Sequence, residues 1–473
     1  MARKKTNLLL KNVKITGLAA EGKAFGHAED GKIVFVPFAI PESIVDIRVT
    51  RKQRNFMEGT ITNVVEPSPL ALTPFCIHFG ICGGCKWQNL PYEEQLKYKQ
   101  QQVVEQLERI GKLKDLPLQA ILASPKTKEY RNKLEYTFSN KRWITQEEVD
   151  SNAAIENSNA LGFHIPKLFD KVLDINTCYL QPEPSNSIRL AVKKFAVEHG
   201  YDFFDIRNKS GFLRNLMIRN TTTGEVMVVV VFFYDDKEKR EALLDFIQQS
   251  FPQVKSLMYV INGKLNDSLG DQDVLLYKGK DYITEVMDGL QFRIGAKSFY
   301  QTNPEQAFRL YQKTLELASL KGNELVYDLY TGTGTIALFV ARYCKKVIGI
   351  EYVEEAIVDA KQNAKQNGIA NAVFYAGDMK DVLTTGFVEQ NGHPDVVILD
   401  PPRAGVHQDV IRTLLNILPE RIVYVSCNPA TQARDIQLLS ECYAVKKVQP
   451  VDMFPHTHHV ENIVLLEHIQ IKE

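Results

Sequence analysis

The sequence predicts a multidomain protein: an N-terminal β-barrel of five strands, an α+β central domain and a C-terminal α/β domain of the doubly wound, Rossmann-like class. Three observations predict this order. The first 66 residues read as short strands separated by turns, residues 76–85 contain three closely spaced cysteines, and the chain from residue 297 repeats strand–helix units. A chain of 473 residues is long enough for two or three domains with separate cores.

The composition is that of a water-soluble globular protein. Hydrophobic residues make up 44% of the chain, and 57 basic residues balance 57 acidic ones. No apolar stretch approaches the roughly 18 residues of a membrane span. The basic start of the chain lacks the apolar segment and cleavage site of a signal peptide. We therefore expect a cytoplasmic monomer without a membrane partner.

Residues 1–66 are the candidate barrel, which resembles an OB-like fold. The dipeptide Asp30-Gly31 indicates a hairpin turn between two of its strands. This region contains 11 lysine and arginine residues against 7 aspartate and glutamate residues, with phenylalanines between them. Basic grooves with aromatic platforms bind single-stranded nucleic acid, so an RNA-binding barrel is one interpretation. The other is a barrel that only docks on its neighbour.

A cysteine motif follows the barrel. The stretch "PFCIHFGICGGCKWQ" (74–88) has the spacing C-x5-C-x2-C, and its glycines let thiolates converge on one centre. A turn-rich loop near residue 178 supplies the best fourth ligand. Four thiolates fit an iron–sulfur cluster or tetrahedral zinc, and the lone fourth cysteine favours a [4Fe-4S] cluster over paired zinc knuckles. Four unrelated buried thiols are the remaining alternative. The candidate metal ligands are Cys76, Cys82, Cys85 and Cys178.

The boundaries of the other two domains follow from the pattern of elements. We assign residues 67–91 and 119–296 to the central domain, and residues 92–118 and 297–473 to the C-terminal domain. Within the first of these, the polar stretch 145–159 reads as a surface insertion, whose role the sequence does not indicate.

The first strand–helix unit of the C-terminal domain contains a glycine turn. "GTGTIA" (332–337) matches a dinucleotide fingerprint, which by itself leaves a nicotinamide dehydrogenase open. Asp328, four residues before Gly332, gives the pattern D-x3-G-x-G, which resembles the first motif of class I methyltransferases that bind S-adenosylmethionine. A later strand ends in Asp400-Pro401-Pro402, which is typical of methyltransferases acting on planar bases and which dehydrogenases do not need.

Another strand of this domain, in "RIVYVSCNPATQ" (421–432), ends immediately before Cys427. Ligands of doubly wound sheets bind at the carboxyl ends of the strands, so this thiol is predicted to face the active cleft. A buried structural thiol is the alternative.

Three stretches together resemble the RNA (uracil-5-)-methyltransferase family: "LDPPRAG" (399–405), "YVSCNP" (424–429) and "DMFPHTHHVEN" (452–462). The barrel is similar to the TRAM domain, and the cysteine motif is similar to the iron–sulfur site of the 23S ribosomal RNA branch. Transfer RNA-modifying members generally lack both. The resemblance implies a uridine of 23S ribosomal RNA as substrate, with a transfer RNA uridine as the alternative target.

The resemblance also implies roles for single residues. Cys427 matches the family's nucleophile and Glu461 its proton-abstracting base, whereas His458 stands where glycine is common. The positions that match cofactor contacts are Gln301, Asp328, Tyr330, Gly332, Gly334, Thr335, Glu351, Asp378 and Asp400.

The reaction explains these residue types. Carbon 5 of uracil is too weak a nucleophile to attack a methyl sulfonium until a thiolate adds to carbon 6. A carboxylate must then remove the carbon 5 proton before the thiolate can leave. The base must also be unstacked to be reached.

Three other functions remain as alternatives. RNA cytosine-5 methyltransferases usually have a second cysteine after the proline of their D-x-P-C motif, where this chain has Pro402-Arg403. Radical chemistry would favour a C-x3-C-x2-C motif and a β/α barrel. A non-catalytic RNA-binding assembly factor is opposed by the intact pair of Cys427 and Glu461.

Overall fold

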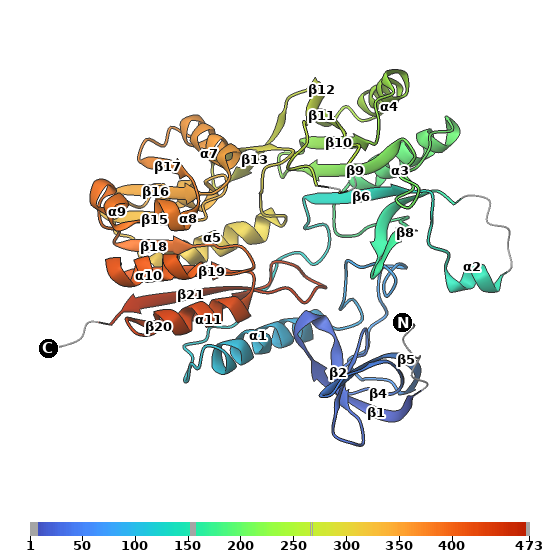
Figure 1. Cartoon of the computed structure of the whole chain (residues 1–473), viewed down its shortest axis with the longest axis horizontal. Helices are drawn as coiled ribbons and strands as arrows, with labels where there is room; N and C mark the ends of the chain where they lie inside the picture. The colour runs from blue at the N-terminus through green and yellow to red at the C-terminus, as the bar shows by residue number, and fades with distance from the viewer. Residues whose placement is uncertain (1–7, 152–157, 265, 267, 470–473) are drawn as a thin grey trace.

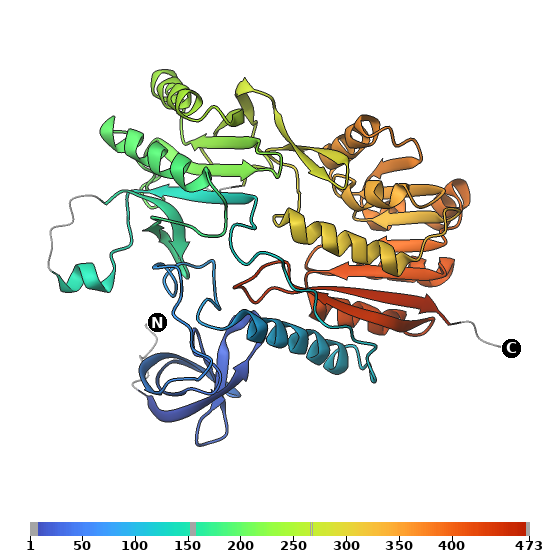
Figure 2. The same ribbon diagram turned by 180° about the vertical axis from the view of Figure 1, so that it is seen from behind.

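The computed structural model describes residues 8–151, 158–264, 266 and 268–469, and it confirms the multidomain class (Figure 1). A barrel, a central sheet and a C-terminal sheet with helices lie around a shared centre. The view from behind (Figure 2) shows helix α1 (Tyr92–Arg109) between the barrel and the C-terminal sheet. Within the described ranges, no helix is long and apolar enough to cross a membrane.

The N-terminal region is a closed barrel of five strands in the order β1-β2-β3-β5-β4. Alternate side chains of each strand point inward, and Ile15, Val34 and Ile47 are fully buried. The predicted hairpin is present, because Gly31, with φ 78°, donates its N–H to the Ala28 carbonyl between β2 and β3. The strands are β1 (Leu9–Leu18), β2 (Ala24–His27), β3 (Ile33–Val36), β4 (Ile44–Lys52) and β5 (Phe56–Glu66), with the short helix η1 (Ala20–Gly22) after β1.

The central domain contains a seven-stranded mixed sheet in the order β12-β11-β10-β9-β6-β7-β8. Strand β10, "VMVVVVF", is buried along its whole length. One face packs on α3 and α4, and the other packs on the ribbon β13–β14, so both faces must be apolar. Residues 152–157 of the predicted insertion lie outside the described residues. The elements are β6 (Lys133–Ser139), α2 (Gln146–Asp150), β7 (Ala160–Ile165), β8 (Leu168–Asp174), α3 (Ser185–Glu198), β9 (Leu213–Asn220), β10 (Val226–Phe232), α4 (Lys237–Ser250), β11 (Val254–Ile261), β12 (Leu275–Gly279), β13 (Tyr282–Met287) and β14 (Leu290–Gly295).

The C-terminal domain is a seven-stranded sheet in the order β17-β16-β15-β18-β19-β21-β20. The five strands from β17 to β19 are parallel, and the hairpin β20–β21 adds two antiparallel strands. The elements are α5 (Pro304–Ala318), β15 (Leu325–Leu329), α6 (Thr335–Ala341), β16 (Lys346–Glu351), α7 (Glu354–Gln366), β17 (Ala372–Ala376), α8 (Met379–Val382), α9 (Thr385–Asn391), β18 (Val396–Leu399), α10 (Gln408–Ile417), β19 (Arg421–Ser426), α11 (Pro429–Leu439), β20 (Tyr443–Val451) and β21 (Glu461–His468).

Helices cover both faces of this sheet, as the doubly wound class requires. Helices α5, α6 and α7 pack on one face, and α1 packs with α8, α9, α10 and α11 on the other. Helix α1, which lies between the two chain segments of the central domain, contributes the fully buried Val103 and Leu107 to that second face. The C-terminal core therefore includes a segment from the N-terminal quarter of the chain.

A buried ion pair fastens α1 to the chain after β20. Lys99 Nζ lies 2.5 Å from Asp452 Oδ1, and both side chains have no exposed surface. Tyr92 donates its hydroxyl hydrogen to Asp452 Oδ2 at 2.7 Å, and Lys99 also donates to the Phe454 carbonyl at 3.0 Å. These extra hydrogen bonds satisfy charges that would otherwise be left in a low-dielectric interior.

Replacing Lys99 by alanine should lower stability by about 3–5 kcal/mol, because it leaves the Asp452 carboxylate buried without its partner. Trp87, whose ring lies 5.9 Å from Lys99 Nζ, provides a local fluorescence signal for urea unfolding. Lys97→Ala is the matched control, since Lys97 on the same helix is 70% exposed and pairs with Glu94. It should lose less than about 1 kcal/mol. Equal losses in the two variants would contradict the assigned role of the pair.

Candidate active site

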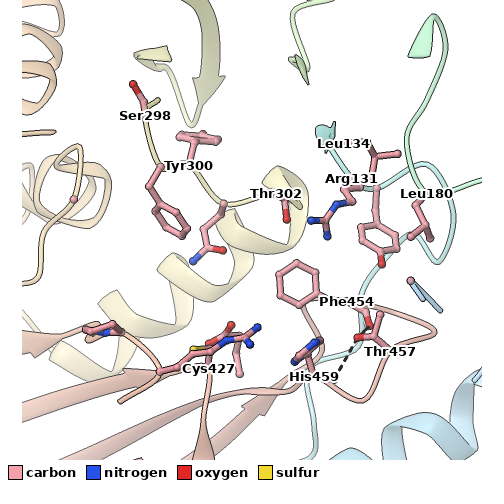
Figure 3. A pocket seen from close by; sticks show the side chains of 18 of the residues that line it. Arg131, Leu134, Leu180, Ser298, Tyr300, Thr302, Cys427, Phe454, Thr457 and His459 are labelled. Carbon is pink, nitrogen blue, oxygen red and sulfur yellow. Dashed lines mark hydrogen bonds between the residues drawn. The ribbon is translucent and has the colours of Figure 1, made fainter. Parts of the chain in front are cut away.

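The parallel strands of the C-terminal sheet end at one edge, where the structure has a cavity of about 1360 Å³. Tyr330 follows β15, Glu351 ends β16, Asp400 follows β18 and Cys427 follows β19, and all four line this cavity. Figure 3 shows its wall running from Cys427 past Phe454 and His459 to Arg131 and Leu180 of the central domain. The site therefore lies between the C-terminal and central domains.

The glycine turn leaves room for a ligand beside the sheet edge. Gly332 has φ 56°, and a Cβ atom built there would meet no other atom within 4 Å. The Glu351 carboxylate holds the turn, because Oε2 accepts the Gly332 N–H at 3.1 Å and Oε1 accepts the Val353 N–H at 3.0 Å. Gln301 and Thr335, two further predicted cofactor residues, line the same part of the cavity.

Two predicted cofactor residues lie behind the cavity wall. Asp328 is fully buried and accepts a hydrogen bond from Thr331 Oγ1 at 2.5 Å. Burial, together with the carboxylates of Asp400 and Glu351, raises the pKa of Asp328 to about 7. Gly334 precedes α6 with φ 78°, and a Cβ there would lie 3.0 Å from the Ala360 Cβ. Both residues support the turn from behind.

Asp378 lies in a second, smaller cavity of about 520 Å³, which shares Tyr330, Tyr352 and Pro402 with the first. Its carboxylate accepts the N–H of Lys380 at 3.3 Å and so caps the short helix α8. The structure thus places Asp378 next to the main cavity and outside its lining.

Cys427 follows β19 at the turn into α11. Burial, with the carboxylates of Glu461 and Asp400, raises the pKa of the Cys427 thiol to about 11, and Arg403 opposes this shift. The Asn428 side-chain amide donates to the Arg403 carbonyl at 3.0 Å, which ties the Asp-Pro-Pro-Arg turn to the turn that carries Cys427. The thiol is therefore neutral in the ligand-free protein near pH 7.

Glu461 is the first residue of β21 and pairs with Val451 of β20. Burial and the nearby Asp400 carboxylate raise the pKa of Glu461 to about 8, with Arg403 again opposing. Burial raises the pKa of Asp400 to about 7. The sequence analysis did not predict Arg403 as a site residue. Its position directly after Asp400-Pro401-Pro402 could have indicated that it lies near the site.

Exposed aromatic side chains are a second feature that sequence reasoning missed. Phe299 is 69% exposed and Tyr352 is 71% exposed, and both line the main cavity. Large exposed rings at a cavity are platforms for planar ligands. Phe299 lies two residues before Gln301, and Tyr352 directly follows Glu351, and both neighbours were among the predicted site residues. The sequence does not show that these two rings are exposed.

The same cavity extends to the four predicted metal ligands, Cys76, Cys82, Cys85 and Cys178. Burial raises the pKa of Cys82 to about 11 and that of Cys85 to about 12, and the charges of the other cysteines add to both shifts. The buried Arg189 and the half-buried Arg131 oppose the effect at Cys178. The four thiols and Arg131 line the same cavity, and Arg189 lies behind them, hydrogen-bonded to the Ile175 and Asn176 carbonyls.

The described residues show no assembled metal site around these thiols. Over the residues that the structure describes, no three His, Cys, Asp or Glu side chains group closely enough to hold a metal ion. Tetrahedral zinc, at about 2.3 Å from each sulfur, needs sulfurs within about 4 Å of one another. The predicted ligands line one cavity, but the described residues form no metal site, so the iron–sulfur cluster stays a prediction.

Comparison with known proteins identifies the family. A family model described as tRNA (uracil-5-)-methyltransferase matches residues 269–469, and a TRAM domain model matches residues 10–62. A protein of Bacteroides thetaiotaomicron described as an uncharacterized RNA methyltransferase is 57% identical over 453 residues, which cover 95% of this chain and 100% of that protein. A similarly described protein of Porphyromonas gingivalis is 58% identical over 461 residues, covering 96% and 99%. The chain belongs to a family of RNA methyltransferases, and residues 269–469 form its tRNA (uracil-5-)-methyltransferase domain.

A solved structure of the family resembles the whole chain. The tRNA (uracil-54, C5)-methyltransferase of Pyrococcus abyssi, in complex with S-adenosyl-L-homocysteine, is 29% identical with a TM-score of 0.74. The similarity covers 97% of this chain and 99% of that one, which includes the barrel. Our expectation that transfer RNA-modifying members lack the barrel does not hold for this relative. This chain is accordingly an RNA methyltransferase that uses S-adenosylmethionine.

The charges around Cys427 can be tested by alkylation. Iodoacetamide reacts with the thiolate, so the rate at Cys427 reports its pKa. At pH 9, Arg403→Gln should slow alkylation and Glu461→Gln should accelerate it, each by up to about tenfold, the factor for one pKa unit. Arg403→Lys, which keeps the charge, should stay near wild type. Mass spectrometry of the Cys427 peptide gives the rates, and identical profiles for all variants would contradict the electrostatic assignment.

Proposed function

We propose that this protein methylates carbon 5 of a uridine in RNA through a covalent bond between Cys427 Sγ and carbon 6 of the base. One observation carries the proposal: a thiol and a buried carboxyl of raised pKa, Cys427 and Glu461, line a cavity that continues to the glycine turn.

The glycine-turn side of the cavity suits S-adenosylmethionine, which supplies an electrophilic methyl group when bound. The Glu351 carboxylate has lone pairs left for ribose hydroxyls after binding two backbone N–H groups. Gln301, Tyr330, Gly332 and Thr335 line this space, Asp328 supports it through Thr331, and Asp378 contributes from the adjoining cavity. Asp400 lines the same cavity as Cys427, and its charge contributes to the raised pKa of the Cys427 thiol.

Cys427 begins the chemistry by adding to the base. Its thiol must first lose a proton, which the positive charge of Arg403 favours against burial and two carboxylates. The thiolate forms a bond to carbon 6, and the electrons of the carbon 5–carbon 6 double bond form an enolate. Carbon 5 then takes the methyl group, and the sulfonium sulfur keeps the electron pair of the broken bond.

Glu461 completes the reaction. Its carboxylate takes the proton that remains on carbon 5, the freed electron pair re-forms the double bond, and the bond from carbon 6 to Cys427 breaks. With a pKa raised to about 8, Glu461 holds a removed proton well and is a stronger base than an ordinary carboxylate. Both residues work in their deprotonated forms, so activity should rise with pH.

The shape of the cavity supports an unstacked base as substrate. The exposed Phe299 ring offers a stacking surface for a base that has left its helix. We propose that the TRAM barrel binds the flanking single-stranded RNA. We propose a loop of 23S ribosomal RNA as the target. The likeness to the Pyrococcus abyssi tRNA (uracil-54, C5)-methyltransferase supports transfer RNA as the second candidate. Mass-spectrometric mapping of both RNAs from cells lacking the protein distinguishes them.

We further propose that Cys76, Cys82, Cys85 and Cys178 hold a [4Fe-4S] cluster. The support for this proposal is that all four thiols line the same cavity, and that the other cysteines contribute to the raised pKa of Cys82, Cys85 and Cys178. Methyl transfer needs no electron transfer, so the cluster would act by shaping the chain around the cavity.

Cys427→Ala should abolish methylation while cofactor and RNA still bind, because the thiolate is needed for the chemistry alone. Glu461→Gln should instead add to the base and methylate it, then stall before elimination and accumulate as a covalent protein–RNA adduct. Denaturing gels with labelled RNA should show a slow-migrating band for Glu461→Gln and none for Cys427→Ala. Wild-type turnover by Glu461→Gln would exclude it as the base and direct attention to His456, His458 and His459.

Anaerobically purified protein should be brown and contain about four atoms each of iron and sulfide. Cys178→Ser should lose most of the iron, since it removes one of four ligands, whereas Cys442→Ser, outside the proposed site, should keep it. Colourless protein with one zinc per chain, or equal iron in the two variants, would overturn this part of the proposal.

A further inference from the structure

The loop between β20 and β21, residues 452–460, is held by segments from far away in the chain. It ends at Glu461 and contributes Phe454, Thr457 and His459 to the cavity wall. Its middle residue, His456, has φ 64°, a left-handed backbone conformation that a histidine seldom adopts. Such a conformation persists only where surrounding contacts enforce it.

Those contacts come from the segment after the cysteines and from α1. The His456 carbonyl accepts the N–H groups of Lys86 at 2.8 Å and Trp87 at 3.1 Å. The His456 N–H donates to Gln95 Oε1 at 2.9 Å, and Gln95 Nε2 lies 3.2 Å from His456 Nδ1. Every polar backbone group of the strained residue is therefore bound by another segment.

Gln95 joins the two sides of this arrangement. Its side chain has no exposed surface, and its Nε2 also donates to the carbonyls of Trp87 at 2.9 Å and Leu90 at 2.8 Å. One amide group thus binds the segment after Cys85 and the loop before Glu461 simultaneously. Trp87 extends the connection to the barrel, because its Nε1 donates to the Gly22 carbonyl at 3.1 Å.

The barrel also touches the loop directly. A Cβ atom at Gly22, with φ 77°, would lie 2.9 Å from the His458 Cβ. The His458 side chain therefore packs where a side chain at position 22 would collide with it, and the glycine leaves the necessary room. Barrel, cysteine segment and α1 all contact the same ten residues that end at the proposed base.

We propose that Gln95 and His456 form a clasp that sets the position of Glu461, which makes Gln95 a positioning residue for removal of the carbon 5 proton. The inference rests on the proposed function. A base must lie within hydrogen-bond reach of the proton it removes, and a displacement of about 1 Å can cost about 100-fold in rate. Addition by Cys427 and methyl transfer depend on β19 and the glycine turn, which the clasp does not contact.

The test measures the two halves of the reaction separately. Ribosomal and transfer RNA, prepared from cells that lack the protein and labelled with tritium at carbon 5 of uridine, is mixed with S-adenosylmethionine labelled with carbon-14 in its methyl group. Carbon-14 in RNA and in covalent adduct counts methyl transfer, and tritium in water counts proton removal. A variant that is only less stable loses both counts in the same proportion.

Gln95→Met keeps the length of the side chain and removes its hydrogen bonds. We expect the first-turnover methyl transfer to stay near wild type, tritium release to slow about tenfold or more, and methylated adduct to accumulate. Gln101→Met is the matched control, since Gln101 lies on the exposed side of the same helix, and it should release tritium in step with methylation. Glu461→Gln, which removes the proposed base itself, should slow tritium release the most.

Two outcomes overturn the clasp and leave the proposed base intact. In the first, Gln95→Met loses methyl transfer and tritium release in the same proportion. In the second, Gln95→Met releases tritium at the wild-type rate while Glu461→Gln does not release it. If Glu461→Gln itself releases tritium at the wild-type rate, the assignment of the base fails, and the role of the clasp fails with it.

Discussion

Burial of like charges at one edge of a parallel sheet is the constraint on which this structure depends. Asp328 and Glu461 are buried and Asp400 is partly buried, and loss of solvation raises the pKa of each carboxyl to about 7 or 8. Ionised carboxylates in such a place repel one another and lack the solvation of water. A cationic ligand relieves that repulsion, and so does Arg403. Positive charge near these carboxyls therefore favours their ionised forms, as Arg403 does at Glu461.

In the proposed mechanism, burial matters because it sets the proton affinity of Glu461 and Cys427. An ordinary glutamate with a pKa near 4.5 is a poor base for a carbon-bound proton, whereas Glu461, at about 8, holds the proton once it has taken it. The carboxylates of Glu461 and Asp400 also disfavour the thiolate form of Cys427. Arg403 opposes both shifts, so one exposed arginine influences both groups of the proposed mechanism.

Several distant segments of the chain together enclose the cavity at this edge of the C-terminal sheet. The sheet supplies one wall, and the central domain and the cysteine segment supply the other. The loop before Glu461 lies between them and is bound by α1 through the Lys99–Asp452 pair and through Gln95. The barrel is thus joined to the catalytic region and is not a separate appendage. Its presence does not separate ribosomal from transfer RNA enzymes, since the Pyrococcus abyssi relative covers 97% of this chain.

The sequence by itself determined the class of each domain and the residues that follow the strands. Strand periodicity, glycine turns and the three family motifs are local patterns, so the barrel, the doubly wound sheet and the positions of Asp400 and Cys427 could be predicted. Tertiary structure alone decided the rest, because burial and long-range contacts leave no local signal. Asp328 and Gly334 lie behind the cavity wall, and Asp378 lines a neighbouring cavity. Tertiary structure also brought Gln95 to His456, 361 residues away, where one buried amide binds both segments.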